Sequence, residues 1–230
     1  MRILAIGAHP DDVEFGVGGL LIKEAEKGSQ IKVVICSLGE AGTNGTPEGR
    51  KQEATAAAKF YNAEIEFLDF GGDSHMEYTP QNGFQIAKVM REFKPDIVLA
   101  PSLTENQHPD HLTVAKLTHD ACRYARYGGL AELKSSPVHK IGALYYYSSS
   151  SEWDKGPQII VDVTAVHGKW EQAMQAHRSQ MKTRAYLDLV NSKAQALGKS
   201  IGVDYAVGLR ANDPIRVDCL SDLELSSRNY

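Results

Sequence analysis

Short apolar runs alternate with helical patterns along most of the chain. The first run, Ile3 to Ala8, is rich in β-branched residues, and apolar residues then recur at helical spacing from Val13 to Ala25. A second apolar run, Ile31 to Leu38, follows at the interval of a strand-helix-strand unit. Apolar strands without polar alternation are typical of parallel sheets that helices cover on both faces. The pattern therefore predicts a parallel sheet.

The same alternation continues almost to the end of the chain. It predicts an α/β fold with a mostly parallel sheet and helices on both faces. The length of 230 residues suits a single domain, 1–230, in which residues 140–230 form a C-terminal extension packed on the core. Further strands are predicted at Glu64–Phe70, Asp96–Pro101, Ile141–Tyr147 and Gln158–Val163, helices at Arg50–Phe60, Phe84–Phe93, Leu112–Tyr127, Val166–Met181 and Tyr186–Leu197, and a mixed, strand-like tail at Val203–Val217.

Composition excludes several classes of function. The formal net charge of -4 provides no electrostatic attraction for nucleic acid or for an anionic membrane surface. No apolar stretch approaches the roughly 20 residues that span a bilayer. The N-terminus leads directly into a strand-like run rather than a signal peptide. The three cysteines form no CxxC pair, which is typical of a reducing compartment, so a cytoplasmic location is expected.

Two groups of histidine and aspartate follow apolar strands. His9–Asp12 (HPDD) ends the first strand, and His108–His111 (HPDH) follows the strand that ends at Pro101. Ligands of open α/β sheets bind at the carboxyl ends of the strands, so we expect the two groups to meet there. Alone, His9 would be read as a structural residue and Asp12 as a helix N-cap. Two such groups at two strand ends favour a metal site.

Three of these side chains form the predicted ligand set, namely His9, Asp12 and His111. Catalytic zinc sites usually have three protein ligands from histidine and carboxylate, and they leave a fourth position for water or substrate. With one carboxylate, a divalent ion keeps a residual positive charge, which favours ionisation of a bound water. Residue types do not separate zinc from iron or cobalt.

The remaining polar residues of the two groups are available for proton transfer. Asp11 lies beside a metal ligand without binding the metal, and it is the candidate general base. His108 is free to act as an acid or to stabilise an oxyanion. Asp110 is placed to hold His108 in one tautomer and to raise its pKa. Together the residues indicate metal-assisted hydrolysis.

The motifs resemble one known family. AHPDDVEFGVGG near the N-terminus and HPDH after the fourth strand are similar to the LmbE-like (PIG-L) family of zinc-dependent N-acetylglucosamine deacetylases. The segments GEAGTNGTPEGRKQEA, AHRSQM and ALGKSIGVDYAVGL resemble the subgroup that deacetylates N-acetylglucosaminyl-malate in bacillithiol biosynthesis. The resemblance covers nearly the whole chain.

The resemblance implies a Rossmann-like sheet and the same zinc ligands and catalytic residues. It further implies that Arg50 lies at the substrate mouth and that Tyr186 lies over the metal as a donor to the oxyanion. It implies a small GlcNAc-type substrate and a homo-oligomer, often a hexamer. His177 is the other histidine expected to approach the site. The loops 72–83 and 148–157 match nothing diagnostic, and substrate choice can differ there.

Three other functions are weighed against deacetylation of the malate conjugate. Within the same chemistry, the substrate could be a chito-oligosaccharide or an inositol glycoside. A nucleotide-binding oxidoreductase would need a glycine-rich loop after the first strand, and HPDD takes that place; FGVGG (Phe15–Gly19) lacks the G-x-G-x-x-G order. A non-catalytic, metal-dependent carbohydrate-binding protein would have no use for Asp11.

Overall fold

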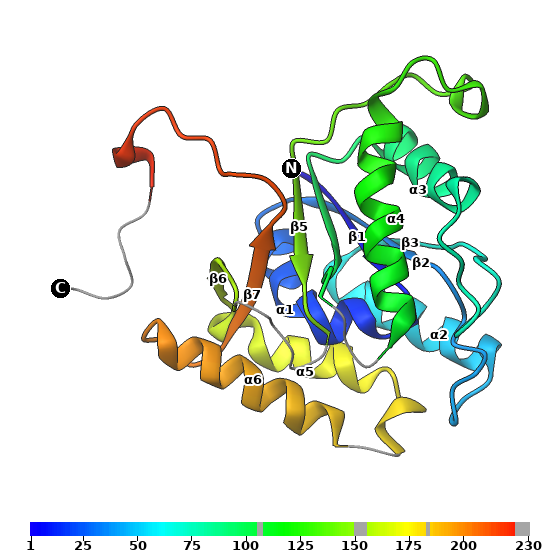
Figure 1. Cartoon of the computed structure of the whole chain (residues 1–230). Helices are drawn as coiled ribbons and strands as arrows, with labels where there is room; N and C mark the ends of the chain where they lie inside the picture. Colours follow the sequence, from blue (N-terminus) through cyan, green and yellow to red (C-terminus); the bar gives the residue numbers. More distant parts are fainter. Residues whose placement is uncertain (105–107, 150–155, 183–184, 224–230) are drawn as a thin grey trace.

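The computed structural model describes residues 1–104, 108–149, 156–182 and 185–223. These residues form a seven-stranded sheet in the order β3-β2-β1-β4-β5-β7-β6, with helices on both faces (Figure 1). The α/β fold class predicted from the sequence is confirmed.

The elements follow the predicted alternation closely. The strands are β1 (Arg2–Gly7), β2 (Gln30–Ile35), β3 (Glu64–Phe67), β4 (Ile97–Pro101), β5 (Ala143–Tyr147), β6 (Ile159–Asp162) and β7 (Ala206–Ala211). The helices are α1 (Asp12–Glu26), α2 (Pro47–Ala58), α3 (Pro80–Phe93), α4 (Pro109–Arg126), α5 (His167–Gln175) and α6 (Tyr186–Ser200). In the part of the chain that is described, every helix lacks either the length or the hydropathy of a membrane-crossing segment.

The parallel part of the sheet determines where the site lies. β1 is central and pairs in parallel with β2 and β4, and β3 and β5 continue the parallel set on either side. The carboxyl ends of these strands therefore share one edge of the sheet. β7 pairs antiparallel with β5, and β6 pairs antiparallel with β7. The strand-like tail predicted at Val203–Val217 thus contains one strand, β7, which runs antiparallel to its neighbours.

Both faces of the sheet are buried, which explains why β1 shows no polar alternation. Side chains of α1, α5 and α6 pack on one face together with Ile3 and Ala5 of β1. Side chains of α3 and α4 pack on the other face together with Leu4 and Ile6. All four of these β1 residues are buried.

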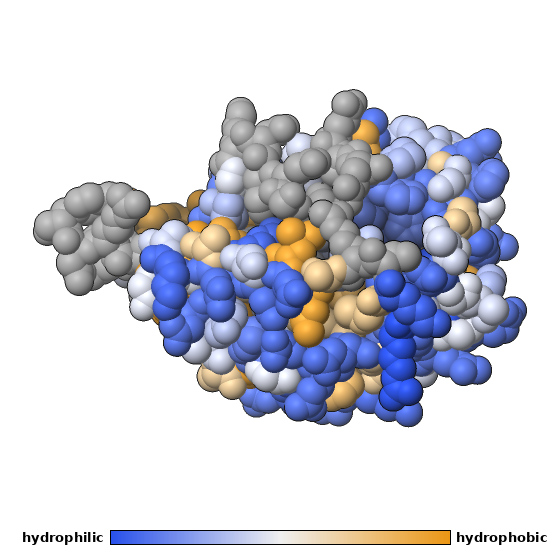
Figure 2. Space-filling view, turned by 90° about the horizontal axis from the view of Figure 1, so that it is seen from below, coloured by the Kyte–Doolittle hydropathy of each residue, from blue (hydrophilic) through white to orange (hydrophobic). Residues whose placement is uncertain are grey.

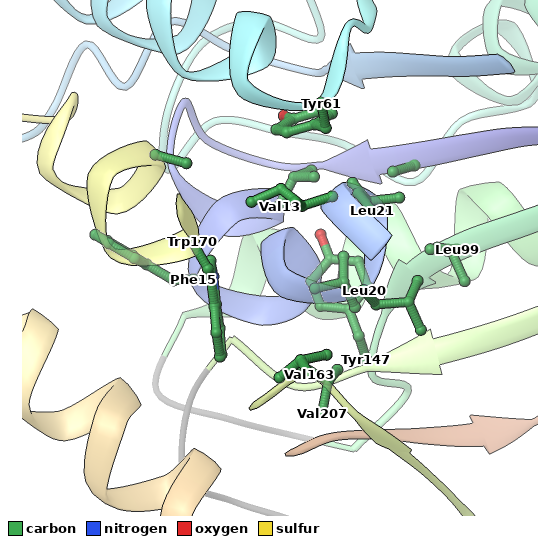
Figure 3. Packing of buried hydrophobic residues seen from close by; sticks show 14 of the residues in the cluster. Val13, Phe15, Leu20, Leu21, Tyr61, Leu99, Tyr147, Val163, Trp170 and Val207 are labelled. Atoms are coloured by element: carbon green, nitrogen blue, oxygen red, sulfur yellow. The ribbon is translucent and has the colours of Figure 1, made fainter. Parts of the chain in front are cut away.

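Glycines allow α1 to pack closely against its neighbours. A Cβ atom on Gly16 would lie 2.3 Å from the ring of Tyr147, and one on Gly18 or Gly19 would lie 2.9 Å from the ring of Trp170. Both aromatic residues lie beside α1 in the core (Figure 3). The Tyr147 hydroxyl donates to the Ile6 carbonyl oxygen at 2.7 Å, so the ring also ties β5 to β1. The FGVGG segment is a packing motif in this protein.

One predicted helix is interrupted. The segment Val166–Met181 was expected to be continuous, but α5 ends at Gln175 and the chain turns before a short 3-10 helix at Gln180–Lys182. The turn brings two buried polar side chains to distant partners: His177 Nε2 lies 3.0 Å from Glu14 Oε2, and the Ser179 hydroxyl donates to Glu53 Oε2 at 2.6 Å. These distant partners have no signal in local periodicity.

Gly16→Ala is expected to destabilise the protein by about 1–3 kcal/mol, because the added methyl group overpacks the contact with Tyr147. Gly168→Ala is the matched control, since Gly168 lies in α5 with no atom within 4 Å of a Cβ. It is expected to stabilise by about 0.5–1 kcal/mol through helix propensity. Urea unfolding of both variants measures the two effects, and equal stabilities would contradict the packing role of Gly16.

Candidate metal centre and active site

The turn that follows β1 places the Asp12 carboxylate at the end of the strand. The chain turns after His9, with the Asp11 backbone N–H donating to the His9 carbonyl oxygen at 2.9 Å. Asp12 is the first residue of α1, and its Oδ2 accepts hydrogen bonds from the backbone N–H groups of Ala8 and His9, each at 2.9 Å. The carboxylate therefore accepts hydrogen bonds from the backbone at the end of the strand and not from that of the helix. Asp12 is thus not the N-cap of α1. Its other oxygen, Oδ1, faces α4.

The three predicted ligands meet at this point. His111, in the first turn of α4, brings Nε2 to 2.9 Å from Asp12 Oδ1. His9 Nδ1 lies 3.5 Å from Asp12 Oδ2. One ligand atom from each of the three residues lies within 4.8 Å of the others, and all three side chains are buried. Two imidazoles and one carboxylate are the donor set of many catalytic zinc sites, so the residues fit a divalent metal ion. Metal binding itself stays a prediction.

The far side of His9 is held by two carboxylates. His9 Nε2 lies 3.2 Å from Asp110 Oδ2 and 3.4 Å from Asp73 Oδ1. Burial would lower the pKa of His9, but the hydrogen bonds to Asp110, Asp12 and Asp73 outweigh it and raise the pKa to about 12 in the metal-free protein. Metal binding at Nδ1 would displace a proton, and the carboxylates would fix the ring and increase its basicity.

Asp110 lies between two histidines. Its Oδ2 is 3.2 Å from His9 Nε2 and 3.9 Å from His108 Nδ1, and it also accepts the backbone N–H of Ser74 at 2.7 Å. The sequence predicted the contact with His108 but not the closer one with His9. At 3.9 Å, the Asp110 carboxylate is beyond hydrogen-bond distance of His108. Its charge does oppose the effect of burial, but the pKa of His108 is lowered and not raised as expected. The closer histidine partner of Asp110 is His9, a predicted metal ligand.

Asp73 is the residue that sequence reasoning missed. It follows β3 in the loop 72–83, and its Oδ1 lies 3.4 Å from His108 Nε2 as well as close to His9. The hydrogen bond to His9 lowers the pKa of Asp73 to about 2, against the effect of burial. Its only sequence signal is an acidic residue at the carboxyl end of a third parallel strand.

His108 faces the site as a neutral imidazole. Its side chain is 31% exposed, more than any of the predicted ligands, and burial and the nearby His9 lower its pKa. His108 is the N-cap of α4, and its Nδ1 accepts the backbone N–H of Asp110 at 3.4 Å. A ring that accepts at Nδ1 carries its proton on Nε2, which faces Asp73 Oδ1 at 3.4 Å and is also the candidate donor to a substrate oxygen.

Asp11 is set apart from the ligand group. Its Oδ1 lies 3.6 Å from Arg50 Nη2, and its side chain makes no capping hydrogen bond to α1. Burial and the charge of Asp12 raise the pKa of Asp11, and Arg50 and His177 partly oppose that rise. A carboxylate with a raised pKa beside a metal group suits a general base.

Arg50 is more deeply buried than the sequence suggested. The residue is 4% exposed, and its Nη1 donates to the Gly39 carbonyl oxygen at 2.9 Å while Nη2 faces Asp11. Gly39 has φ of 69°, and a Cβ atom there would lie 1.7 Å from Arg50 Nη1, so glycine is required for this approach. The guanidinium joins the loop that contains Gly39 to Asp11.

A cavity of about 440 Å³ connects these groups at the carboxyl edge of the sheet. One side is polar and holds the ligand group, Asp11, Arg50 and His108, with Thr43, Asn44 and Gln180 beside them. The other side is apolar, with Phe15, Tyr186, Leu189 and Val190. The Tyr186 ring is stacked on Phe15 at a centroid distance of 5.7 Å. Figure 2 shows this edge of the molecule, where hydrophobic surface lies within a largely hydrophilic face.

His177, the other histidine expected near the site, contacts Glu14 of α1 and is not among the residues that line the cavity. It is fully buried, and its Nε2 contacts Glu14, which also accepts a hydrogen bond from the Tyr61 hydroxyl. Burial would lower the pKa of His177, but Glu14 outweighs it and raises the pKa. The electrostatic effect of His177 in turn lowers the pKa of Asp11.

The chain belongs to the PIG-L family. The family model described as GlcNAc-PI de-N-acetylase matches residues 4–122, more than half of the chain. The matched part contains both histidine-aspartate groups and Asp73. The family resemblance predicted from the sequence is confirmed.

Three curated relatives show the range of the family. A diacetylchitobiose deacetylase from Thermococcus kodakarensis is 29% identical over 91% of this chain and 82% of its own length. A 4-oxalmesaconate hydratase from Pseudomonas putida is 29% identical over 92% of this chain and 89% of its own. The "Probable N-acetyl-alpha-D-glucosaminyl L-malate deacetylase 2" of Bacillus subtilis is 27% identical over 78% and 83%.

A solved structure confirms the fold. The N,N'-diacetylchitobiose deacetylase from Pyrococcus horikoshii, in complex with an inhibitor, aligns with a TM-score of 0.82 at 25% identity. The alignment covers 91% of this chain and 83% of that one.

Replacing a predicted ligand is expected to weaken metal binding. His111→Ala and His9→Ala each remove one nitrogen donor from a three-ligand set, so zinc should be lost on dialysis against a mild chelator. His119→Ala is the control, because His119 is exposed on α4 and lies outside both candidate metal groups of the described residues. Elemental analysis after dialysis measures the effect, and full zinc content in both ligand variants would disprove the ligand set.

Arg50→Met is expected to lower kcat about 10- to 100-fold with a smaller change in KM, because Asp11 loses the cation that holds it. Steady-state kinetics separate the two parameters. A raised KM with unchanged kcat would instead show that Arg50 binds the substrate directly, as the family resemblance implied.

Proposed function

We propose that the protein is a metal-dependent hydrolase that removes the N-acetyl group from a GlcNAc conjugate. One observation carries the proposal. A buried His-Asp-His group and a separate carboxylate, Asp11, line one cavity in a chain of the PIG-L family. A binding site needs the ligands alone, whereas hydrolysis also needs a group that accepts the proton of water. Asp11 is that additional group.

The protein residues divide the reaction between them. A divalent metal held by His9, Asp12 and His111 would polarise the acetamide carbonyl and lower the pKa of a water molecule. Asp11 accepts the proton of the attacking water, and the water oxygen bonds to the carbonyl carbon. His108 donates from Nε2 to the developing oxyanion, with Tyr186 as a further proposed donor. The proton held on Asp11 then passes to the nitrogen as the carbon–nitrogen bond breaks, which releases the free amine and acetic acid; the acid ionises to acetate in water.

Zinc is the proposed metal. Two imidazole nitrogens and one carboxylate suit zinc, and they suit iron(II) or cobalt(II) as well. The three ligand side chains are buried and already close together, so they need little rearrangement to bind one divalent ion.

The proposed substrate is N-acetylglucosaminyl-malate. The resemblance to the bacillithiol subgroup and the relative from Bacillus subtilis support it. The alternatives are a chito-oligosaccharide, supported by the relative from Thermococcus kodakarensis, and an inositol glycoside, supported by a deacetylase of Salinispora arenicola that acts on such a compound and is 25% identical. The homo-oligomeric, possibly hexameric state and the cytoplasmic location stay predictions.

A hydratase is the second candidate. It is favoured by the 4-oxalmesaconate hydratase, which matches this chain as well as the deacetylase relatives do. Both reactions add water with the help of a base, so Asp11 serves either. The two reactions differ in that amide hydrolysis also requires a proton for the leaving nitrogen. A non-catalytic carbohydrate-binding protein remains the candidate from another class.

Acetate release from a panel of GlcNAc conjugates tests the proposal. The panel contains the malate glycoside, diacetylchitobiose and the inositol glycoside, with 4-oxalmesaconate as the hydration substrate. The zinc-loaded protein should release acetate, and the chelator-treated protein should not. Hydration of the unsaturated acid without acetate release would replace the proposal with the hydratase. Sugar binding without either reaction would indicate a binding protein.

Asp11→Asn is expected to lower kcat about 10²- to 10⁴-fold while zinc content is retained, because the amide cannot accept a proton. Asp188→Asn is the control, since Asp188 is an exposed residue of α6 near the same face. Turnover and metal content are measured on the same samples. Near-normal turnover of Asp11→Asn would show that another group is the base.

A further inference from the structure

The second ring nitrogen of His111 has a partner of a different kind from that of His9. His111 Nδ1 lies 3.2 Å from the Ser149 hydroxyl oxygen. His9 Nε2, by contrast, faces the carboxylates of Asp110 and Asp73. Carboxylates only accept hydrogen bonds, whereas a hydroxyl both donates and accepts. The two predicted histidine ligands are therefore oriented by different chemistry.

Ser149 is placed by the end of β5 and by α6. The strand ends at Tyr147, whose hydroxyl is bonded to the Ile6 carbonyl oxygen of β1. The next residue, Ser148, is buried, and its carbonyl oxygen accepts a hydrogen bond from Lys193 Nζ at 2.8 Å. Burial lowers the pKa of Lys193 to about 8. Hydrogen bonds thus hold both residues that precede Ser149, and the Ser149 hydroxyl lies beside His111.

A hydroxyl at this position can serve His111 with and without metal. In the metal-free arrangement, Nε2 lies 2.9 Å from Asp12 Oδ1 and can donate to it, so Nδ1 accepts from the Ser149 hydroxyl. A ligating imidazole must have its lone pair on Nε2, so its proton moves to Nδ1 and is donated to the Ser149 oxygen. The ring changes tautomer without moving. A carboxylate in place of the hydroxyl would favour only the second arrangement.

We propose that Ser149 is a positioning residue for His111 and that Lys193 holds Ser149 in place through the Ser148 carbonyl. The proposal rests on the proposed function, because it takes His111 to be a metal ligand. Ser149 lines the same cavity, but the role proposed for it is exerted through His111 and not on the substrate. Its effect is on the affinity for metal, and only through that on activity.

Zinc affinity of the whole chain tests this, by competition with a chromophoric chelator. Ser149→Ala is expected to bind zinc about tenfold more weakly, as is typical when the outer partner of a ligating histidine is removed. Ser149→Thr keeps the hydroxyl and is expected to recover most of the affinity. Thr118→Val is the control, because the Thr118 hydroxyl is buried in α4 without a hydrogen-bond partner in the described part of the chain. It is expected to leave zinc affinity unchanged.

Lys193→Met tests the second part of the proposal. It removes the ammonium group and keeps a long apolar side chain, so it should weaken zinc binding in the same direction as Ser149→Ala but less. The two substitutions together should cost less than the product of their separate effects, because they act through one path. If the two substitutions weaken zinc binding independently, Lys193 does not act through Ser149, and that part of the proposal is wrong.

The outcomes distinguish this proposal from the proposed function. Absence of zinc binding by the wild-type chain would contradict the proposed function. Zinc binding by the wild type with equal affinity in Ser149→Ala would overturn only the role of Ser149. The melting temperature of each metal-free variant provides the second readout. If metal-free Ser149→Ala melts well below the metal-free wild type, its loss of zinc affinity follows from a structural role of Ser149. That result would also overturn the positioning role.

Discussion

The site depends on one carboxylate, that of Asp12. Its Oδ2 is held by two backbone N–H groups at the end of β1, and its Oδ1 reaches His111 at the start of α4. The carboxylate thereby joins two segments that are a hundred residues apart in the sequence. Burial would raise the pKa of Asp12, but His111 and His9 outweigh it and hold the pKa well below its usual range. A buried carboxylate that ionises readily and lies between two histidines is a preformed place for a cation.

The surrounding charges explain how two adjacent aspartates acquire different tasks. Asp12 turns toward the two histidines, whereas Asp11 turns toward Arg50, whose guanidinium also contacts the loop at Gly39. Burial and the charge of Asp12 raise the pKa of Asp11 against the effect of Arg50, whereas His111 and His9 hold the pKa of Asp12 low. On the other side, Asp73 and Asp110 place two more carboxylates behind His9 and beside His108. The protein thus keeps ligand, base and outer carboxylates apart although all lie at one edge of the sheet.

The sequence was sufficient to predict the sheet and the meeting of His9, Asp12 and His111 at its edge, because both follow from local patterns and parallel strand order. Apolar runs located the strands, and the parallel arrangement required their polar endings to meet. Asp73, Ser149 and the contact between Arg50 and Asp11 could not be predicted, because each depends on how a loop lies against a distant element. The interruption of the helix predicted at Val166–Met181 has the same origin, since His177 and Ser179 turn toward partners on α1 and α2.

The most direct test of the account is the zinc content of Asp11→Asn and Asp12→Asn, measured side by side after dialysis against a mild chelator. The two residues are neighbours and the two substitutions are chemically identical, so only the assigned roles distinguish them. The account predicts that Asp11→Asn retains zinc like the wild type, while Asp12→Asn loses it. Equal zinc content in the two variants, or loss from Asp11→Asn alone, would contradict the division of metal binding and proton transfer between them.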